Sequence, residues 1–405
     1  MTPGLVVLAG STAFAGYTYA GYPALLWLLS RRRTPARAAV ITEWPVISIV
    51  LPVYNEEAEI RHALDTILAA DYPVSRRQVV VVSDASTDRT DDIVREYAGR
   101  GVELLRRPQR GGKTAGENAA LPIIHGEIVI NTDASVRVHP GALKALVRAL
   151  EAPGVGVASA RDVSVAAGQG NSAEAGYVGY EMWVRALETA ALGIVGASGC
   201  LYAIRADIHR HPVPEALSRD FASALTAREL GYRAVSVPDA VCFVPHTPSL
   251  REEYRRKVRT IARGLNTLAY KRHLLNPWRY GAFAWMLLSH KVCRWILPWT
   301  GLAALAALGT LAGRNLWAGV MGAGVALGLL GALVGWCWPG DGAPRLLRAF
   351  ALGVAGNVAV LHAWVRAATG RKTPSWAPTR RPSPALTRSQ HHRERPQHDL
   401  EVLQR

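Results

Sequence analysis

The sequence is short of charged residues, and of acidic ones in particular. Only 19% of its 405 residues are Asp, Glu, Lys or Arg, and 31 acidic residues stand against 47 basic ones, which gives a net charge of +16. Hydrophobic residues reach 49%, which excludes a disordered chain because such chains are poor in apolar residues. A nucleic-acid-binding protein usually combines basic charge with a polar surface, so this class is also disfavoured. The balance fits a membrane protein with a basic cytoplasmic side.

Cysteine is equally scarce. The chain has 4 cysteines, and they form no CxxC pair or other zinc-ligand spacing. A disulfide framework and a structural zinc site are therefore not expected. The four positions are Cys200, Cys242, Cys293 and Cys337.

The first long apolar run lies at the N-terminus. Residues 5–29 carry no charge, and Arg31, Arg32 and Arg33 follow directly. About 20 apolar residues suffice to cross a bilayer. No positive charge precedes the run, unlike in a signal peptide, and the positive-inside rule puts the basic cluster in the cytoplasm. We expect a transmembrane helix at 1–30 and a basic linker at 31–44; a buried helix of a soluble protein is the alternative.

A second apolar block occupies the C-terminal third. Charged and Trp residues mixed into 283–295 indicate a helix in the membrane interface, whereas the following runs are apolar enough to span. Three such spans would put the basic tail outside, against the charge rule, unless 283–299 also inserts. The expected spans are 296–312, 316–338 and 346–365. The expected segments are basic and interfacial helices at 251–295, transmembrane helices at 296–368 and a disordered basic tail at 369–405.

Between residues 45 and 250 short apolar runs alternate with longer helical patterns. This alternation predicts βαβ units, an α/β fold and a mainly parallel sheet flanked by helices. The first run is almost entirely apolar, as in a strand that is covered on both faces. The expected strands are 46–53, 78–83, 102–106, 127–132 and 155–160, and the expected helices are 56–70, 90–100, 114–125 and 141–151.

Polar residues follow three of these strands. Tyr54, Asn55 and Glu56 come after the first, Asp84 after the second and Asp133 after the strand that ends at Thr132. Ligands of open α/β sheets bind at the carboxyl ends of the strands, so these residues predict a binding site. Helix capping by Asn, Asp, Ser and Thr is the alternative reading.

Several motifs in the same region stand in a recognisable order, and together they resemble the family 2 glycosyltransferases. The first two motifs are specific in combination, and the later ones are weak alone. The resemblance covers roughly residues 45–300, and the membrane layout resembles that of hyaluronan, cellulose and poly-N-acetylglucosamine synthases. The motifs are Pro52-Val53-Tyr54-Asn55-Glu56-Glu57, Val82-Ser83-Asp84-Ala85-Ser86-Thr87-Asp88-Arg89-Thr90, Gly111-Gly112-Lys113, Asn131-Thr132-Asp133-Ala134-Ser135, Gly196-Ala197-Ser198-Gly199-Cys200, Arg219-Asp220-Phe221 and Gly231-Tyr232.

The resemblance implies a GT-A domain at 45–250, a nucleotide-diphosphate sugar donor, with a UDP-sugar expected, and inverting transfer. Asp220 matches the catalytic base; its alternative role is the N-cap of a helix at 221–230. Trp183 could stack on an acceptor sugar, but we expect a core aromatic. Implied nucleotide-sugar-binding residues are Pro52, Tyr54, Asn55, Glu56, Asp84, Lys113, Asp133, Arg256 and Arg259, and implied acceptor-binding residues are Gly199 and Cys200.

The chain departs from the family pattern at two places. Residues 255–260 read Arg-Arg-Lys-Val-Arg-Thr where processive relatives have Q-x-x-R-W, so Arg256 and Arg259 are expected at the diphosphate, with a basic face on anionic lipid as the alternative. Ser135 replaces the second Asp of the family's D-x-D motif. We therefore expect weakened binding of Mg²⁺ or Mn²⁺ by Asp133, with His246 as a further ligand or a structural residue.

These observations favour a multi-pass enzyme of the cell (inner) membrane with a cytoplasmic catalytic domain. It would glycosylate a polysaccharide or lipid-linked acceptor in cell-envelope polysaccharide biosynthesis, with membrane lipids and no nucleic acid as partners. The alternative is a non-enzymatic nucleotide-sugar-binding subunit of a polysaccharide assembly complex.

Overall fold

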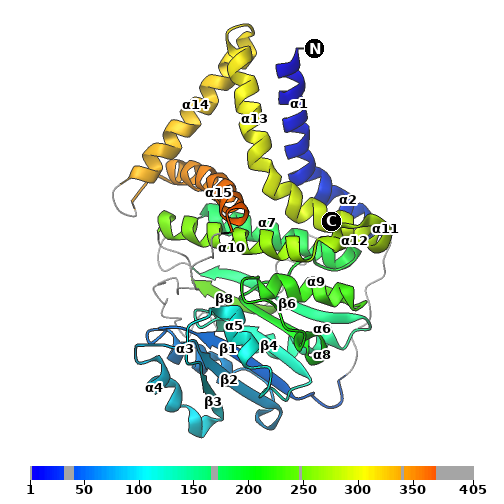
Figure 1. Cartoon of the computed structure of the whole chain (residues 1–405), viewed down its shortest axis with the longest axis vertical. Coiled ribbons are helices and arrows are strands. Elements are labelled where there is room, and N and C mark those ends of the chain that lie inside the picture. Colours follow the sequence, from blue (N-terminus) through cyan, green and yellow to red (C-terminus); the bar gives the residue numbers. More distant parts are fainter. Residues whose placement is uncertain (1, 32–40, 166–171, 246–248, 339–341, 371–405) are drawn as a thin grey trace.

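The computed structural model describes residues 2–31, 41–165, 172–245, 249–338 and 342–370. The tail at 371–405, His246 and most of the basic linker lie outside these residues. The described chain consists of an α/β domain and a group of long helices above it (Figure 1).

An eight-stranded sheet forms the centre of the α/β domain, in the order β3-β2-β1-β4-β7-β6-β8-β5. The pairs β1–β2, β2–β3, β1–β4 and β6–β8 are parallel, and β4–β7, β6–β7 and β5–β8 are antiparallel. The expected mainly parallel sheet is confirmed, although β5, β7 and β8 were not foreseen. The strands are Ile47–Val53 (β1), Arg77–Ser83 (β2), Val102–Arg106 (β3), Ile128–Thr132 (β4), Arg137–Val138 (β5), Val155–Val165 (β6), Leu201–Arg205 (β7) and Arg233–Pro245 (β8).

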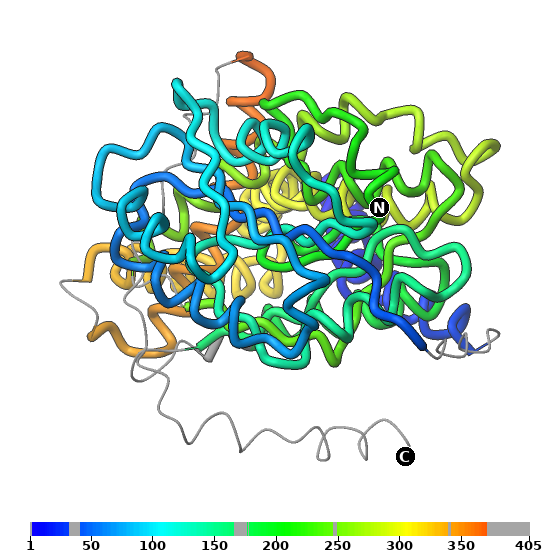
Figure 2. Tube along the Cα trace, turned by 90° about the horizontal axis from the view of Figure 1, so that it is seen from below, coloured from blue at the N-terminus to red at the C-terminus, as the bar shows by residue number. Residues whose placement is uncertain are grey.

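Helices cover both faces of this sheet, as the apolar run of β1 predicts. Ile49 and Leu51 of β1 belong to a core that includes Leu64 and Leu146, whereas Val50 joins a second core on the other face. Figure 2 shows the domain from below, with the blue and cyan first half beside the green second half. The helices are Ile60–Leu68 (α3), Thr90–Arg95 (α4), Lys113–Ala119 (α5), Ala142–Leu150 (α6), Ser172–Ala191 (α7), Ala206–His209 (α8), Arg219–Glu229 (α9), Leu250–Tyr270 (α10) and Pro277–Tyr280 (α11).

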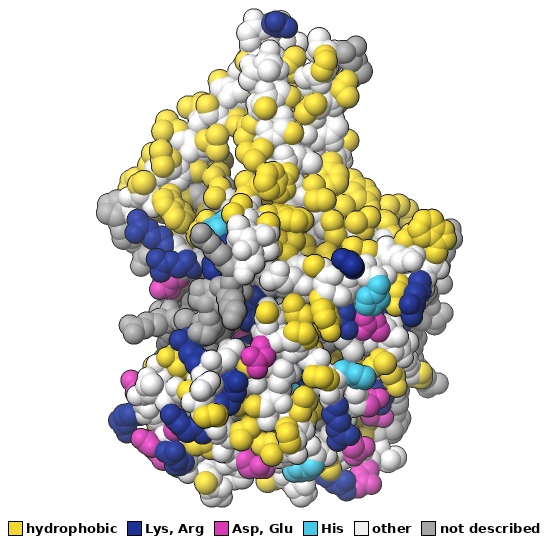
Figure 3. All heavy atoms as spheres, viewed as in Figure 1, with side chains coloured by type: hydrophobic (Ala, Val, Ile, Leu, Met, Phe, Trp, Pro, Cys, Tyr) yellow, Lys and Arg dark blue, Asp and Glu magenta, His cyan; other side chains and the backbone are white. Residues whose placement is uncertain are grey.

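Three helical segments in the described part of the chain are long and apolar enough to cross a membrane: Ala282–Ala312, Leu316–Cys337 and Arg345–Ala368. Hydrophobic side chains dominate the upper part of the molecule, whereas charged side chains gather on the domain below (Figure 3). Leu316 and Trp317 expose 80% and 76% of their surface, which suits a lipid environment and not water. The three segments correspond to α12 (Ala282–Leu287), a π-helical segment (Leu288–Cys293) and α13 (Arg294–Ala312), then α14 (Leu316–Cys337) and α15 (Arg345–Ala368).

The N-terminal run is also helical and packs along α13. It consists of α1 (Pro3–Gly16), a π-helical turn (Tyr17–Gly21) and α2 (Tyr22–Ser30). Gly4 allows close approach, because a Cβ there would lie 3.2 Å from Thr310 Oγ1. This run is not one of the three segments above, so its crossing of the membrane stays a prediction.

The predicted boundary between an interfacial helix at 283–295 and a span from 296 does not exist, because one helix runs through both. The charged residues that suggested the boundary do not face water. His290 lies 2.6 Å from Glu188 and 3.0 Å from Glu181, and Arg294 lies 2.5 Å from Glu181, both carboxylates being on α7. Tyr22 of α2 donates a hydrogen bond of 2.5 Å to the same Glu188. These hydrogen bonds and the Arg294–Glu181 ion pair join the domain to the helices above it.

α15 lies crosswise to α13, against α10 at the boundary between the two parts (Figure 1). Near its C-terminal end, Ala363 and Trp364 pack with Ala262 and Leu265 of α10. Tyr254 of α10 hydrogen-bonds His362 of α15 at 2.9 Å, and its ring also contacts Trp336 at the end of α14. The whole of α15 thus stays near the domain, although its length and composition would allow a crossing.

Trp183 of α7 is not a core residue, contrary to expectation. It is 45% exposed and contacts Tyr180, with 5.9 Å between ring centroids. α7 contacts the strands β6 and β8 and also the helix α2. The sheet therefore covers only part of its surface.

Candidate active site

The candidate site lies at the carboxyl edge of β4, where the antiparallel β7 begins. Leu201 pairs with Thr132, so the residues before β7 lie beside the residues after β4. Thr132 Oγ1 donates a hydrogen bond of 2.9 Å to the carbonyl of Cys200. The reversal of β7 therefore brings Gly199 and Cys200 next to Asp133, which a parallel strand would not do.

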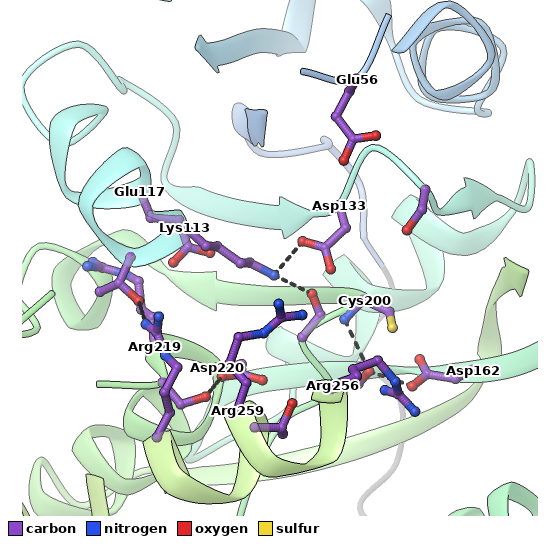
Figure 4. A pocket seen from close by; sticks show the side chains of 17 residues that line it. Glu56, Lys113, Glu117, Asp133, Asp162, Cys200, Arg219, Asp220, Arg256 and Arg259 are labelled. Atoms are coloured by element: carbon purple, nitrogen blue, oxygen red, sulfur yellow. Dashed lines mark hydrogen bonds and ion pairs between the residues drawn. The ribbon is translucent and has the colours of Figure 1, made fainter. Parts of the chain in front are cut away.

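Lys113, the first residue of α5, forms the centre of the site. Its Nζ lies 2.5 Å from Asp133 Oδ1 and donates a hydrogen bond of 2.7 Å to the carbonyl of Gly199 (Figure 4). Burial lowers the pKa of Lys113, but the carboxylates of Asp133, Glu117 and Asp220 together raise it above its ordinary value. Lys113 is therefore a fixed positive charge.

Asp220 faces this charge from the first turn of α9. The alternative interpretation made Asp220 the N-cap of this helix, but the N-cap is Ser218. Instead, the Ser218 hydroxyl donates a hydrogen bond of 2.5 Å to Asp220 Oδ1. A Cβ at Gly199 would lie 2.8 Å from Asp220 Oδ2, so the carboxylate approaches the backbone where only glycine leaves room.

These groups line one cavity of about 290 Å³. Nine of the predicted or discussed residues line it: Glu56, Lys113, Asp133, Ser135, Gly199, Cys200, Asp220, Arg256 and Arg259. Arg256 and Arg259 of α10 thus line the cavity. The alternative interpretation, a basic surface on anionic lipid, would instead have them face the membrane. Arg256 is held by Glu253, with Nε–Oε2 and Nη2–Oε1 distances of 2.7 Å.

Four predicted residues lie beside the cavity and are not among its lining residues. Asp84 is buried and accepts hydrogen bonds from the backbone N–H groups of Gly111, at 2.9 Å, and Gly112, at 2.6 Å, and from Arg107. It thereby holds the turn that leads into Lys113. The Arg110 guanidinium lies over the Tyr54 ring, with its central carbon 3.7 Å from the ring centroid. The other two are Pro52 and Asn55, and Asn55 has a positive φ of 51°.

Sequence reasoning missed further residues of the cavity wall. Glu117 lies one turn after Lys113 on α5, and Arg219 directly precedes Asp220. Asp162 of β6 accepts a hydrogen bond of 2.6 Å from Ser198 Oγ, which fixes the segment before β7. Arg263 of α10 donates a hydrogen bond of 2.8 Å to Thr114 Oγ1. Helical spacing alone points to Glu117 and Arg263, which follow Lys113 and Arg259 by four residues.

Glu117 is fully buried, and neither of its carboxylate oxygens has a hydrogen-bond partner within the described residues. Burial raises its pKa from 4.5 to about 7, while Lys113 and Arg219 act in the opposite direction and Asp220 and Asp133 add to the increase. The folded state therefore holds a proton on Glu117 at pH values where the unfolded chain has lost it.

Replacing Glu117 with Gln is expected to flatten the pH dependence of stability. In the parent protein the melting temperature should fall as the pH rises from 4.5 to about 7, because the unfolded state binds fewer protons than the folded state in this window. The slope is at most about 1.4 kcal/mol per pH unit. Melting curves in detergent between pH 4.5 and 8 test this. The exposed Glu151→Gln control should keep the parent slope, and an unchanged slope in Glu117→Gln would contradict the assignment.

Oxygen ligands for a divalent cation are present but few. Within the described residues, no group of three or more His, Cys, Asp or Glu side chains could hold a metal ion. Asp133 offers a carboxylate and Ser135 a hydroxyl to the same cavity. Mg²⁺ and Mn²⁺ in phosphate-binding sites take one or two carboxylates and complete their shell with substrate phosphates and water. Asp133 and Ser135 thus fit a divalent cation that binds together with the phosphate groups of a substrate.

The comparisons with known proteins agree with this geometry. Residues 48–181 match the glycosyl transferase family 2 domain. A probable glycosyltransferase, YdaM, from Bacillus subtilis is 30% identical over 113 residues, 27% of each chain. A beta-monoglucosyldiacylglycerol synthase from Nostoc sp. is 32% identical over 121 residues, 29% of this chain and 26% of that protein. The matches thus span about a quarter of these two curated relatives.

One solved structure shares the fold over most of the chain. It is the mannosyltransferase PcManGT from Pyrobaculum calidifontis, in complex with GDP-Man and Mn²⁺. The TM-score is 0.70 at 24% sequence identity, and the match covers 90% of this chain and 99% of that one. At this identity the likeness shows the fold alone, and the match to the family 2 domain is limited to residues 48–181. Residues 48–181 are therefore similar to the glycosyl transferase family 2 domain, and the chain has a GT-A-like fold.

Proposed function

We propose that this protein transfers a sugar from a nucleotide-diphosphate sugar to an acceptor hydroxyl at the membrane surface, with inversion at the anomeric carbon. The observation that carries the proposal is the single cavity in which Asp220 faces Lys113 and Asp133, with Arg256 and Arg259 on the wall. A base and a cluster of cations in one cavity are what a direct displacement needs.

In the proposed reaction Asp220 accepts the proton of the acceptor hydroxyl. The hydroxyl oxygen forms a bond to the anomeric carbon while the bond from that carbon to the diphosphate oxygen breaks. The electron pair of the broken bond leaves with the nucleoside diphosphate. Lys113, Arg256 and Arg259 then stabilise the negative charge that grows on the diphosphate, because cations already in place need little reorganisation.

Asp133 and Ser135 would hold a divalent cation together with the diphosphate, and such a cation supplies further positive charge to the leaving group. The donor-bound mannosyltransferase of the same fold contains Mn²⁺. Since Asp133 pairs with Lys113 in the structure, the cation and the lysine would share this carboxylate. Glu56, Asp84 and the residues around Tyr54 remain the proposed neighbours of the nucleoside.

The proposed location is the cell (inner) membrane, with the domain in the cytoplasm. The apolar helices support membrane association. Arg31 to Arg33 follow the N-terminal helix and favour the cytoplasmic side for the domain.

A panel of labelled nucleotide sugars offered to the purified protein in nanodiscs tests the proposal. UDP-glucose, UDP-N-acetylglucosamine, UDP-galactose and GDP-mannose are each supplied with Mg²⁺ or Mn²⁺, and the release of nucleoside diphosphate is measured. One donor should be consumed, and EDTA should suppress the reaction. Binding of a donor without release of its nucleoside diphosphate would favour the non-enzymatic subunit, and no binding of any donor would refute both readings.

A further inference from the structure

A second cavity, of about 410 Å³, lies between the catalytic cavity and the membrane helices. Its walls come from three helices, α7, α10 and α15, and from Asp162 of β6. Asp162 and Arg256 line both cavities, so the two are neighbours across this pair of side chains. In Figure 4, Asp162 and Arg256 lie beside each other on the side of Cys200 away from Lys113.

The second cavity is polar at one end and apolar at the other. Its charged lining residues, such as Asp162 and Arg256, belong to the domain. Its apolar lining includes Leu352 and Gly353 of α15 and Met182 of α7. Since α15 lies at the boundary of the domain and the apolar helices, the apolar end is at the depth of the membrane surface.

The cations of this cavity already have carboxylate partners. Glu253 binds Arg256 through two hydrogen bonds of 2.7 Å and lies 3.8 Å from Lys257. Asp162 and Glu181 add further negative charge to the walls. A headgroup phosphate entering here would meet carboxylates and would compete with Glu253 for both cations. A hydroxyl-bearing headgroup without charge could instead donate hydrogen bonds to these carboxylates.

We propose that the acceptor is a membrane lipid with an uncharged, hydroxyl-bearing headgroup, which reaches Asp220 through the cavity between α7, α10 and α15. This inference rests on the proposed function and names its acceptor. The acyl chains would remain beside Leu352 and Gly353, and the headgroup would pass Asp162 and Arg256. The hydroxyl then loses its proton to Asp220 and forms the bond to the sugar, as in the reaction above.

Gly353 allows the cavity to be filled without disturbing the fold. A Cβ at Gly353 would meet no atom within 4 Å, and the same holds at Gly324 of α14, which does not line the cavity. Gly353→Leu should therefore narrow the lipid path, and Gly324→Leu is the matched control on another membrane helix. Nucleotide affinity and melting temperature of both variants verify that they are folded.

The experiment uses phosphatidylcholine nanodiscs containing dioleoylglycerol, monoglucosyl-dioleoylglycerol or polyprenyl phosphate, and a fourth arm with soluble oligosaccharides. The donor identified in the panel is supplied with a labelled sugar. We expect label in one of the two uncharged lipids, and a loss of at least about tenfold in Gly353→Leu but not in Gly324→Leu, because a misplaced acceptor reacts slowly.

Label in polyprenyl phosphate or in soluble oligosaccharides alone would overturn the inference, and so would equal labelling by Gly353→Leu and the parent protein. If nucleoside diphosphate is released but no uncharged lipid is labelled, the proposed function stands and the acceptor is wrong. If no donor is consumed in any arm, the proposed function itself fails.

Discussion

Replacing Asp220 with Asn should reduce sugar transfer by about 10²- to 10⁴-fold, the range typical of a lost general base. The amide keeps the size of the carboxylate and can still contact Ser218, so the local structure should persist. It has no ionised oxygen to accept the acceptor proton. Donor binding should change little, because the proposal assigns the diphosphate to Lys113 and the arginines of α10 and not to Asp220.

Initial rates of nucleoside diphosphate release and the donor dissociation constant separate these two effects. The control is Asp239→Asn in β8, which makes the same change at an exposed carboxylate away from the cavity. Full turnover by Asp220→Asn would show that another group takes the proton. A parallel loss of donor affinity would instead indicate that Asp220 binds the donor.

Replacing Lys113 with Met should lower both activity and stability. The variant leaves Asp133, Glu117 and Asp220 around a site without its central cation, whose positive form these carboxylates stabilise in the parent protein. Removing one partner of a buried ion pair typically costs about 3–5 kcal/mol. Loss of a preorganised positive group at the leaving diphosphate should slow transfer by about 10²- to 10³-fold.

The double variant Lys113→Met with Asp133→Asn distinguishes the two effects. It removes the unpaired charge of Asp133, so the melting temperature should recover part of its loss relative to Lys113→Met alone. Transfer should not recover, because neither replacement supplies charge to the diphosphate. Recovery of activity together with stability would show that Lys113 is needed only for folding.

The parallel half of the domain could be predicted from the sequence because its signals are local. The apolar runs that became β1 to β4 differ from the predicted strands by at most one residue, and β3 agrees at both ends. Strand ends carry the polar residues, and the strand-end rule directed attention to Glu56 and Asp133, which line the same cavity. The motifs between Pro52 and Ser135 lie within residues 48–181, the part of the chain that matches the family 2 domain.

The remainder of the site depends on contacts between distant segments. Nothing in the sequence around Leu201 shows that β7 runs antiparallel to β4, although this reversal places Gly199 beside Lys113. Asp84 is expected to meet the nucleoside, and its carboxylate also accepts hydrogen bonds from two backbone N–H groups of a turn, which the sequence did not predict. Sequence patterns do not count such backbone donors. Likewise, the polar side chains of His290 and Arg294 predicted a helix in the membrane interface. In the structure their partners are carboxylates of α7.

The crosswise position of α15 decides where the described chain ends relative to the long helices. α13 leaves the domain and α14 returns to it, since Trp336 at the end of α14 contacts Tyr254 of the domain. α15 then ends where Ala363 packs with Ala262. This hairpin brings the chain back to the domain, so Arg366 in the last turn of α15 lies at the same end of the long helices as the domain itself.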